Sequence, residues 1–297
     1  MNDKVTAHPL GRLGNLGTIS VTGVDAKSFL QGQLSFDMGR LTREYVELAA
    51  VNSPQGRVQA VVWLVERSDA IVLLLGAELI ETIVARLRKF VMRAKVSIDP
   101  GRIDPGSHLV VGALAVEAVP AEARGHIELD GLSLIRWPGL AARGIVIAPA
   151  AHSIGAMPEN SALVQQWDLQ DIRSGLPQVF PSTYESFVAQ ILNLDLLQGI
   201  SFDKGCYTGQ EIIARMHFRG QVKRRMLRFA FAGTPPVPGT RVVSDNNHAG
   251  DVVAAAATAD GSELLAVINL PQREERLEID GQPGKELRPL PLPYSME

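Results

Sequence analysis

The segment of this chain best suited to chemistry is residues 204–211, with the sequence KGCYTGQE. It holds the only cysteine among 297 residues, Cys206, between two glycines that let a backbone turn tightly and approach another group closely. Residues 210–217 then carry helix formers and an apolar pair, which predicts a turn at Cys206 just before a helix N-terminus. The free N–H groups, the helix dipole and Lys204 would favour a reactive thiolate there.

An alternative reading of Cys206 is a small buried hydrophobe, which is what free cysteines most often are. A nucleophilic pair with His217 is not expected, because eleven residues of helix would separate the two side chains by about 16 Å. The six histidines show no close pairing with one another or with Cys206, so the sequence predicts no metal site.

Charge is segregated downstream of the cysteine. Residues 212–244 include no acidic residue, although the whole chain has a net charge of −3. This pattern predicts a positive surface for a carboxylate or phosphate ligand, and the alternative is a solvated strand edge that carries basic side chains. The basic residues are Arg215, Arg219, Lys223, Arg224, Arg225, Arg228 and Arg241.

Composition describes a globular chain of two or three domains, with 46% apolar and 21% charged residues. A pI of about 6.1 gives no general nucleic-acid signature, so direct RNA binding is not expected. The first residues lack the apolar run of a signal peptide, and no apolar stretch approaches the ~20 residues of a membrane span. We therefore expect a cytoplasmic protein with no membrane partner.

Hydrophobic periodicity predicts hairpins followed by a helix and a strand in the first hundred residues. Asp25 is expected to cap a short helix, and apolar residues recur at helical spacing from 80 to 91. This order indicates an α+β layer with mixed or antiparallel pairing. The expected strands are residues 18–22, 44–51, 57–66, 70–75 and 95–98.

Residues 100–106 are rich in Pro and Gly and read as a connection to a second layer. Strands are expected at 110–111, 133–137 and 145–147, whereas 119–125 could be a short helix or a loop. Ser161 is expected to cap a helix that runs through Trp167 and ends at Gly175. From Arg225 onward, short strands with turn signals indicate a small β-barrel.

A longer pattern surrounds Cys206: Gly199-Ile200-Ser201-Phe202 precedes it, and Ala214-Arg215, Phe218-Arg219-Gly220 and Lys223-Arg224 follow. In this pattern the chain resembles the folate-binding YgfZ family, relatives of the glycine-cleavage aminomethyltransferase and of mitochondrial iron–sulfur assembly factors. The resemblance covers nearly the whole chain, although residues 67–165 match in pattern more than in residues. Further matches are Gly23-Val24-Asp25-Ala26, Phe29-Leu30-Gln31-Gly32-Gln33, Gly56-Arg57, Gly175-Leu176-Pro177, Gln190, Asn193-Leu194 and Leu292-Pro293-Tyr294-Ser295.

The resemblance implies an α+β, aminomethyltransferase-like ring of three modules, with a ferredoxin-like layer, a C-terminal β-barrel and folate in a central channel. Residues 1–225 would form two folate-binding modules interleaved in sequence, with internal boundaries near 45, 105 and 160, and residues 226–297 the barrel. Tetrahydrofolate or another reduced folate has a flat pterin and a glutamate tail, which need an aromatic or apolar slot and a cationic exit.

The family also suggests which residues meet the folate. Trp167 matches a tryptophan that the family associates with folate, whereas Leu16 stands where a second aromatic residue is expected. Simpler roles are open: Trp167 as the largest buried residue of an amphipathic helix, Gln31 and Gln33 as an exposed helix end, and Arg57 as a solvent-facing strand residue. The candidate folate contacts are Trp167, Leu16, Gln31, Gln33, Arg57, Lys204, Tyr207, Gln210, Glu211 and Arg224.

The function implied by the resemblance is a folate-binding accessory factor for assembly or repair of iron–sulfur clusters in enzymes, including those that modify tRNA. Its expected partners are iron–sulfur client enzymes or assembly proteins, with Cys206 as the reactive group. One alternative is a folate-dependent one-carbon (aminomethyl) transferase, which would depend on an acidic residue near the folate nitrogen. Another is a noncatalytic module that docks RNA or a protein through its basic segment.

Overall fold

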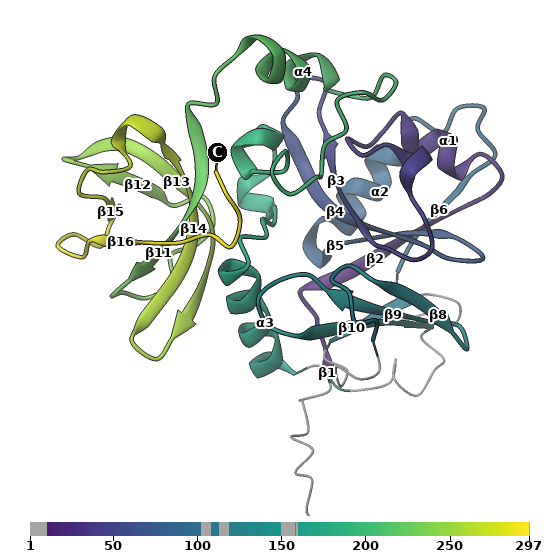
Figure 1. The fold of residues 1–297 in the computed structure, drawn as a ribbon, viewed down its shortest axis with the longest axis horizontal. Coiled ribbons are helices and arrows are strands. Elements are labelled where there is room, and N and C mark those ends of the chain that lie inside the picture. Colours follow the sequence, from purple (N-terminus) through teal and green to yellow (C-terminus); the bar gives the residue numbers. More distant parts are fainter. Residues whose placement is uncertain (1–10, 102–107, 113–118, 150–157, 159, 297) are drawn as a thin grey trace, which may run out of the picture.

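The structure, a computed structural model, describes residues 11–101, 108–112, 119–149, 158 and 160–296, and residues 108–112 by their backbone alone. Three antiparallel sheets form the framework of the fold, and α3 (Ser161–Arg173) lies between the C-terminal sheet and the other two (Figure 1). The predicted α+β class is confirmed. The predicted boundary near 105 and most of the 100–106 connection lie outside the described residues.

The first sheet has the strand order β3-β4-β5-β2-β6, and α2 packs against β2 and β6. Its inner strand β4 is an almost continuous apolar run whose first eight residues are all buried, which is typical of a strand covered on both faces. The predicted meander is confirmed, with strand ends shifted by one to three residues. Its elements are β2 (Leu16–Thr22), α1 (Ala26–Gln31), β3 (Glu47–Asn52), β4 (Val58–Glu66), β5 (Ile71–Gly76), α2 (Ile80–Arg88) and β6 (Ser97–Pro100).

The role predicted for Asp25 is only partly correct. Asp25 precedes α1 at the N-cap position, but its side chain makes no capping hydrogen bond. Its Oδ2 atom instead accepts a hydrogen bond of 2.7 Å from the backbone N–H of Lys95. The carboxylate therefore ties the start of α1 to the chain entering β6, a contact 70 residues away in sequence.

The second sheet has the order β1-β7-β10-β9-β8. All three predicted strands of this layer are present, each longer than predicted, and residues 119–125 form turns and no helix. Arg67 joins this sheet to the first: its buried guanidinium donates to Ser133 Oγ at 2.8 Å and pairs with Glu128. The strands are β1 (Gly11–Arg12), β7 (His108–Gly112), β8 (His126–Leu129), β9 (Leu132–Trp137) and β10 (Arg143–Pro149).

The N-cap of helix α3 lies one residue earlier than the sequence predicts. Asn160, which has extended backbone angles, accepts the N–H of Leu163 on its side-chain oxygen at 3.0 Å, so Ser161 is already inside the helix. The helix ends at Arg173, and Gly175, the residue predicted to end it, follows the C-cap Ser174 with a φ of +65°. A Cβ atom at Gly175 would lie 2.7 Å from the Tyr294 ring, and the Tyr294 hydroxyl donates to the Gly175 carbonyl at 2.9 Å.

The C-terminal sheet curls into a half-barrel with the order β15-β12-β13-β14-β11-β16, around its own apolar core. Its two edges meet at a Glu278–Glu286 bridge and at a 2.8 Å hydrogen bond from Leu287 N–H to Leu277 O. Phe229 and Phe231 are buried in this core, as their alternation predicts. The strands are β11 (Arg224–Phe231), β12 (Arg241–Ser244), β13 (Asn247–Thr258), β14 (Gly261–Asn269), β15 (Glu278–Ile279) and β16 (Leu287–Leu290).

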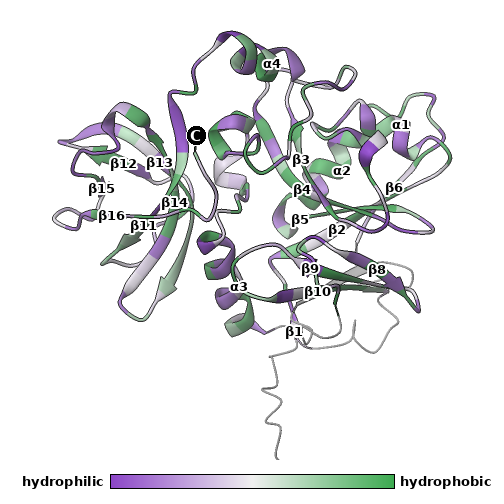
Figure 2. Cartoon of the chain, in the orientation of Figure 1, coloured by the Kyte–Doolittle hydropathy of each residue, from purple (hydrophilic) through white to green (hydrophobic). Residues whose placement is uncertain are grey.

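Paired charges connect the half-barrel to the rest of the molecule. Glu263 on β14 accepts hydrogen bonds from Arg173 of α3 at 2.7 Å and from Arg228 of β11 at 2.6 Å. Arg225 forms a bidentate ion pair with the Asp195 carboxylate, with N–O distances of 2.6 and 2.9 Å. Figure 2 shows hydrophobic residues along the strands, and residues of both kinds on α3 and α4 (Gln210–Arg219), as expected of helices with one packed face.

The Glu263 contacts give a testable pH dependence. Burial acts to raise the pKa of Glu263, but hydrogen bonds and charge from Arg173 and Arg228 outweigh it and hold the pKa below its usual range. A carboxyl group of this kind stabilises the fold above its unfolded pKa and loses that contribution as the pH falls through its folded pKa. Glu263→Gln is therefore expected to lower the free energy of unfolding by about 2 kcal/mol at pH 7.

The loss should be much smaller at pH 3.5, and urea unfolding at both pH values measures it. Glu66→Gln is the matched control, because the Lys27 partner of Glu66 is well exposed. An equal loss from Glu263→Gln at both pH values would contradict this assignment.

Candidate functional site

The segment 204–209 is a tight loop that leads into α4. Gly209 is the N-cap of α4 with a φ of +83°, and a Cβ atom there would lie 2.5 Å from the Ser53 carbonyl oxygen. Gly56, in the turn after β3, packs equally closely against Ile212 of α4. The close approach predicted for the glycines is correct for Gly209 and wrong for Gly205, whose Cβ would meet nothing within 4 Å.

Lys204 holds this loop to the protein through its side chain. The ammonium group donates to three backbone carbonyls, those of Gln31 at 2.8 Å, Leu34 at 2.7 Å and Phe36 at 2.7 Å. It also lies 4.9 Å from the ring centre of Tyr207. Burial lowers the pKa of Lys204 to about 8, against the opposing charge of Asp37.

The loop is further fixed by Gln210 and by a backbone contact. The Gln210 side chain accepts the N–H of Tyr207 at 3.3 Å and donates to the Lys204 carbonyl at 3.4 Å. Thr208 N–H donates to Gly32 O at 3.2 Å, and burial raises the pKa of Tyr207. Three of the sequence candidates, Lys204, Tyr207 and Gln210, thus form one rigid unit.

Cys206 is exposed at the tip of this unit. The alternative reading of a buried core cysteine is therefore wrong. Lys204 is only 8% exposed, so its ammonium group does not share a surface with the thiol as the sequence suggested. The arrangement is a free, exposed thiol on a loop that side-chain hydrogen bonds fasten to the body of the protein.

Gln31 and Gln33 belong to the strip of chain that Lys204 holds, but their side chains are engaged within the protein. Gln31 accepts the N–H of Met38 at 2.7 Å and donates to Asp37 at 2.9 Å. Gln33 accepts from Arg86 at 3.0 Å. Both side chains therefore stabilise the chain segment that lies beside the loop.

The remaining charged candidates are spread over the surface. Arg57 is exposed and donates to the Ser186 carbonyl at 2.9 Å, and Glu211 is exposed in the first turn of α4. Arg224 lies on β11 of the half-barrel, paired with Asp251 at 2.6 Å. Arg57 and Arg224 thus make their contacts away from the Cys206 loop, whereas Glu211 lies in the helix that this loop leads into.

A second cluster contains all three tryptophans of the chain. Trp63 and Trp137 have ring centres 4.9 Å apart, and Trp137 and Trp167 have ring centres 5.9 Å apart. Trp167 is only 2% exposed, and the guanidinium of Arg143 lies 4.4 Å from its ring centre. Arg143 and the Trp137 indole N–H both donate to Asp171, at 2.8 and 3.0 Å. The structure thus shows Trp167 in the simpler of the two roles considered for it, as a large buried residue of α3.

Sequence reasoning missed a contact between the neighbours of Leu16 and Trp167. Their neighbours Asn15 and Asp168 form a 2.6 Å hydrogen bond across 153 residues, from Asn15 Nδ2 to Asp168 Oδ1. Burial, helped by the charge of Asp171, raises the pKa of Asp168 to about 7. The carboxyl group is partly exposed, so it can exchange a proton near neutral pH. No local pattern predicts so distant a pair.

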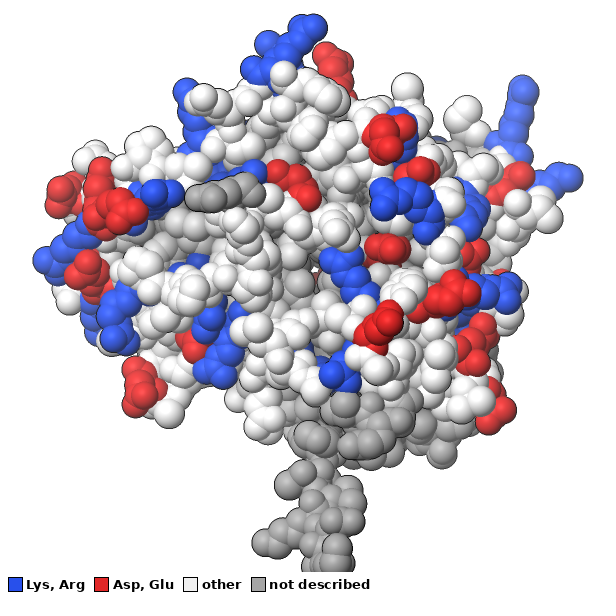
Figure 3. Space-filling model, in the orientation of Figure 1, with Lys and Arg blue, Asp and Glu red and all other residues white. Residues whose placement is uncertain are grey.

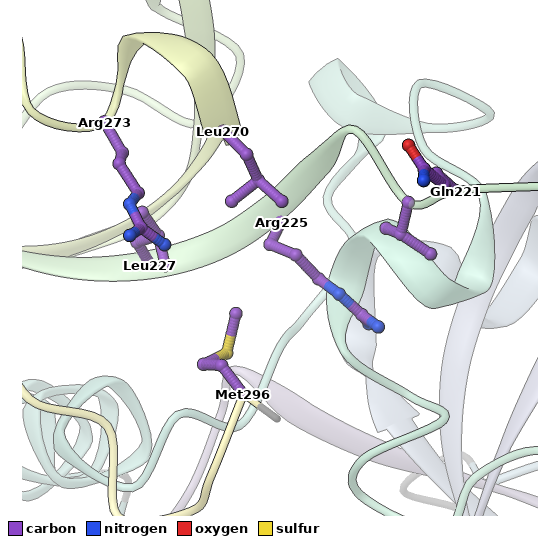
Figure 4. Close-up of a pocket in the computed structure, with 7 residues that line it drawn as sticks. Gln221, Arg225, Leu227, Leu270, Arg273 and Met296 are labelled. Carbon is purple, nitrogen blue, oxygen red and sulfur yellow. The ribbon is translucent and has the colours of Figure 1, made fainter.

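A pocket of about 430 Å³ lies where the half-barrel meets the chain leading from α4 (Figure 4). Its cations are engaged: Arg225 binds Asp195, and Arg273 pairs with Glu274 at 3.0 Å. Lys223 is the one member of the 223–225 run without an ion pair to a described residue. The other lining residues are Gln221, Val222, Leu227, Leu270 and Met296.

Two features are absent from the described part of the chain. Within it, no group of three or more His, Cys, Asp or Glu side chains could hold a metal ion. Nor does any helix among those residues have the length and apolar character needed to cross a bilayer.

Comparison with known proteins places the chain in a family. It is 32% identical over 272 residues to the tRNA-modifying protein YgfZ of Colwellia psychrerythraea, covering 86% of this chain and 83% of that protein. The chain belongs to the YgfZ family. The YgfZ protein of Vibrio vulnificus strain CMCP6 is 30% identical over 302 residues, covering 96% of this chain and 92% of its own length. No protein-family model matches the chain.

The YgfZ-family fold is shared with a solved aminomethyltransferase. The glycine cleavage system aminomethyltransferase T of Bartonella henselae matches with a TM-score of 0.64 and 13% sequence identity, over 95% of this chain and 84% of that chain. At this identity the match establishes the fold alone. The aminomethyltransferase-like fold predicted from the sequence is confirmed, whereas the domain boundaries stay a prediction.

The exposure of Cys206 predicts its reactivity in the folded state. Iodoacetamide is expected to modify one equivalent of thiol at neutral pH without denaturant, because the side chain reaches solvent while the loop stays docked. Mass spectrometry of the intact protein and of its peptides measures the rate and the site. Sub-denaturing urea serves as the control. A rate that rises in proportion to the unfolded fraction would show that the thiol is covered in solution.

Proposed function

We propose that this YgfZ-family protein is a folate-binding accessory factor that supports assembly or repair of iron–sulfur clusters in other enzymes, including enzymes that modify tRNA. The observation that carries the proposal is the exposed thiol of Cys206 on a loop fastened by the buried Lys204. A thiolate can ligate iron transiently while a partner supplies the other ligands. The name of the relatives, tRNA-modifying protein, agrees with such a role in tRNA modification.

The folate part of the proposal rests on the fold and on the Asn15–Asp168 contact. That contact brings together the neighbourhoods of Leu16 and Trp167, the two positions proposed to flank the pterin. Asp168 supplies a partly exposed carboxyl group that would accept hydrogen bonds from pterin N–H groups. Because Trp167 is buried and Arg143 lies over its ring, the pterin would contact Leu16 and Asp168 and would not stack on Trp167.

The other candidate contacts take different parts in this proposal. Lys204, Tyr207 and Gln210 would hold the thiol loop in place, and Gln31 and Gln33 would support the chain segment beside it. Arg57, Arg224 and Glu211 would act only at the rim, where the charge of the glutamate tail is exposed to solvent. Folate would be the resident cofactor of the ring, and it brings one-carbon or structural chemistry that the protein side chains lack.

A one-carbon transferase is the second candidate, and Asp168 is the observation that favours it. Such an enzyme needs an acid near the folate nitrogen, and the pKa of Asp168, about 7, suits proton transfer at neutral pH. A transferase of this kind would not require the Cys206 thiol. The RNA-docking alternative ranks third, because Arg224, Arg225 and Arg228 of the basic segment are all engaged in ion pairs.

Removing the thiol separates the first two functions. Cys206→Ala is expected to lose the activities of cluster-dependent enzymes in cells that lack the endogenous factor, while folate binding and folding stay intact. The measurement is growth complementation with parallel assays of several iron–sulfur enzymes. Cys206→Ser is the matched variant, because it keeps size and polarity without a soft metal ligand. Full activity with Cys206→Ala would contradict the accessory role and leave the transferase.

Asp168→Asn tests the folate site. The amide cannot accept hydrogen bonds as a carboxylate does, so the variant is expected to bind 5-formyltetrahydrofolate about tenfold more weakly by calorimetry. All three tryptophans lie in one cluster, so quenching of their fluorescence reports on the same place. The exposed Asp260→Asn is the control. Equal affinity of Asp168→Asn and wild type would remove Asp168 from the site.

A further inference from the structure

Helix α4 presents a continuous outward face that no described part of the protein covers. It packs onto the body through Ile213, which is buried, and through Met216, which is partly buried. The opposite side lines a shallow groove of about 320 Å³. The residues of this groove recur at i, i+3, i+4, i+7 and i+8, so they form one stripe along the helix. The α4 stripe is Glu211, Ala214, Arg215, Phe218 and Arg219.

The stripe combines an exposed aromatic ring with free positive charge. Phe218 is 69% exposed, and its ring makes edge-on contacts with His217 at 4.7 Å and Phe202 at 6.4 Å between ring centres. Neither Arg215 nor Arg219 forms an ion pair with any described residue. Aromatic and arginine side chains are the residues enriched in protein interfaces and in their energetic hot spots. Figure 3 shows basic side chains gathered at the end of the molecule where α4 lies, with an acidic one beside them.

We propose that the α4 stripe is the docking surface for an acidic, amphipathic segment of a client protein. Apolar residues of that segment would cover Ala214 and Phe218, and its carboxylates would pair with Arg215 and Arg219. The stripe begins five residues after Cys206, at the end of α4 that the Cys206 loop leads into, so a segment lying along α4 would run toward the thiol. This inference rests on the proposed function, in which Cys206 acts on such a client.

The charge order of the stripe favours a protein over single-stranded RNA. Glu211 places a carboxylate at the end of the stripe nearest Cys206, where it would repel a phosphate backbone. RNA binding also relies on successive aromatic platforms, whereas the stripe holds the single ring of Phe218, because Phe202 and His217 stack on each other at 3.7 Å. A protein segment can complement charges of both signs, with carboxylates toward Arg215 and Arg219 and a basic residue toward Glu211.

The experiment places a photo-crosslinking amino acid, p-benzoylphenylalanine, at position 218 of the full chain in living cells. Illumination is expected to give protein adducts whose crosslinked peptides are acidic. The double variant Arg215→Glu/Arg219→Glu should lower their yield about three- to tenfold, as expected for two exposed charge pairs. The same probe at Val237, an exposed apolar position on the half-barrel, is the control.

Matched variants separate docking from chemistry. Lys285→Glu/Arg288→Glu reverses two exposed charges elsewhere and should leave the adducts unchanged. Both charge reversals should keep the wild-type melting temperature, folate affinity and rate of Cys206 alkylation, which excludes unfolding as a cause. Cys206→Ala should abolish the client's activity while keeping its adduct at position 218.

The outcomes decide between the two proposals. Adducts to RNA, no adducts at 218, or adducts insensitive to Arg215→Glu/Arg219→Glu would overturn the docking surface. Adducts support it only when they map to acidic segments of enzymes whose activity falls with Arg215→Glu/Arg219→Glu. If client activity survives Cys206→Ala while the charge-dependent adducts persist, the thiol role fails and the docking surface stands.

Discussion

The bonds from the buried ammonium of Lys204 to the carbonyls of Gln31, Leu34 and Phe36 organise this protein's candidate site. An ammonium group has three donors, and here all three are used, so a buried charge is fully satisfied. These carbonyls belong to the first 40 residues, whereas Lys204 lies some 170 residues later. One side chain therefore joins two chain segments that are far apart in sequence and fixes the loop that carries Cys206.

Local patterns were enough to predict most of the fold. The β3–β4 meander, α2 and the alternating Phe229 and Phe231 follow from apolar periodicity, because burial of one face or stripe dictates it. What failed was the choice of partner for polar groups. Asp25 binds Lys95 N–H, and Asn160 takes the capping role expected of Ser161, because such bonds depend on which distant backbone arrives nearby.

The candidate site was predictable in part for the same reason. The turn at Cys206 and the helix after it could be found from residues 204–217 alone. The burial of Trp167 under Arg143 and the Asn15–Asp168 bond could not, because each joins residues that only the folded ring brings together. The basic segment also looked freer than it is: the acidic partners of Arg224, Arg225 and Arg228 lie outside it, at Asp251, Asp195 and Glu263.

The seating of Tyr294 against Gly175 bears on how the chain is made. Its hydroxyl bonds to a carbonyl 119 residues upstream, and Asn193 holds the same hydroxyl at 3.3 Å. On the ribosome, the first sheet, α3 and the thiol loop are all synthesised before this tyrosine exists. The Tyr294–Gly175 contact therefore cannot form until the half-barrel has been synthesised. Cys206 is thus already part of the nascent chain before this contact stabilises the mature structure.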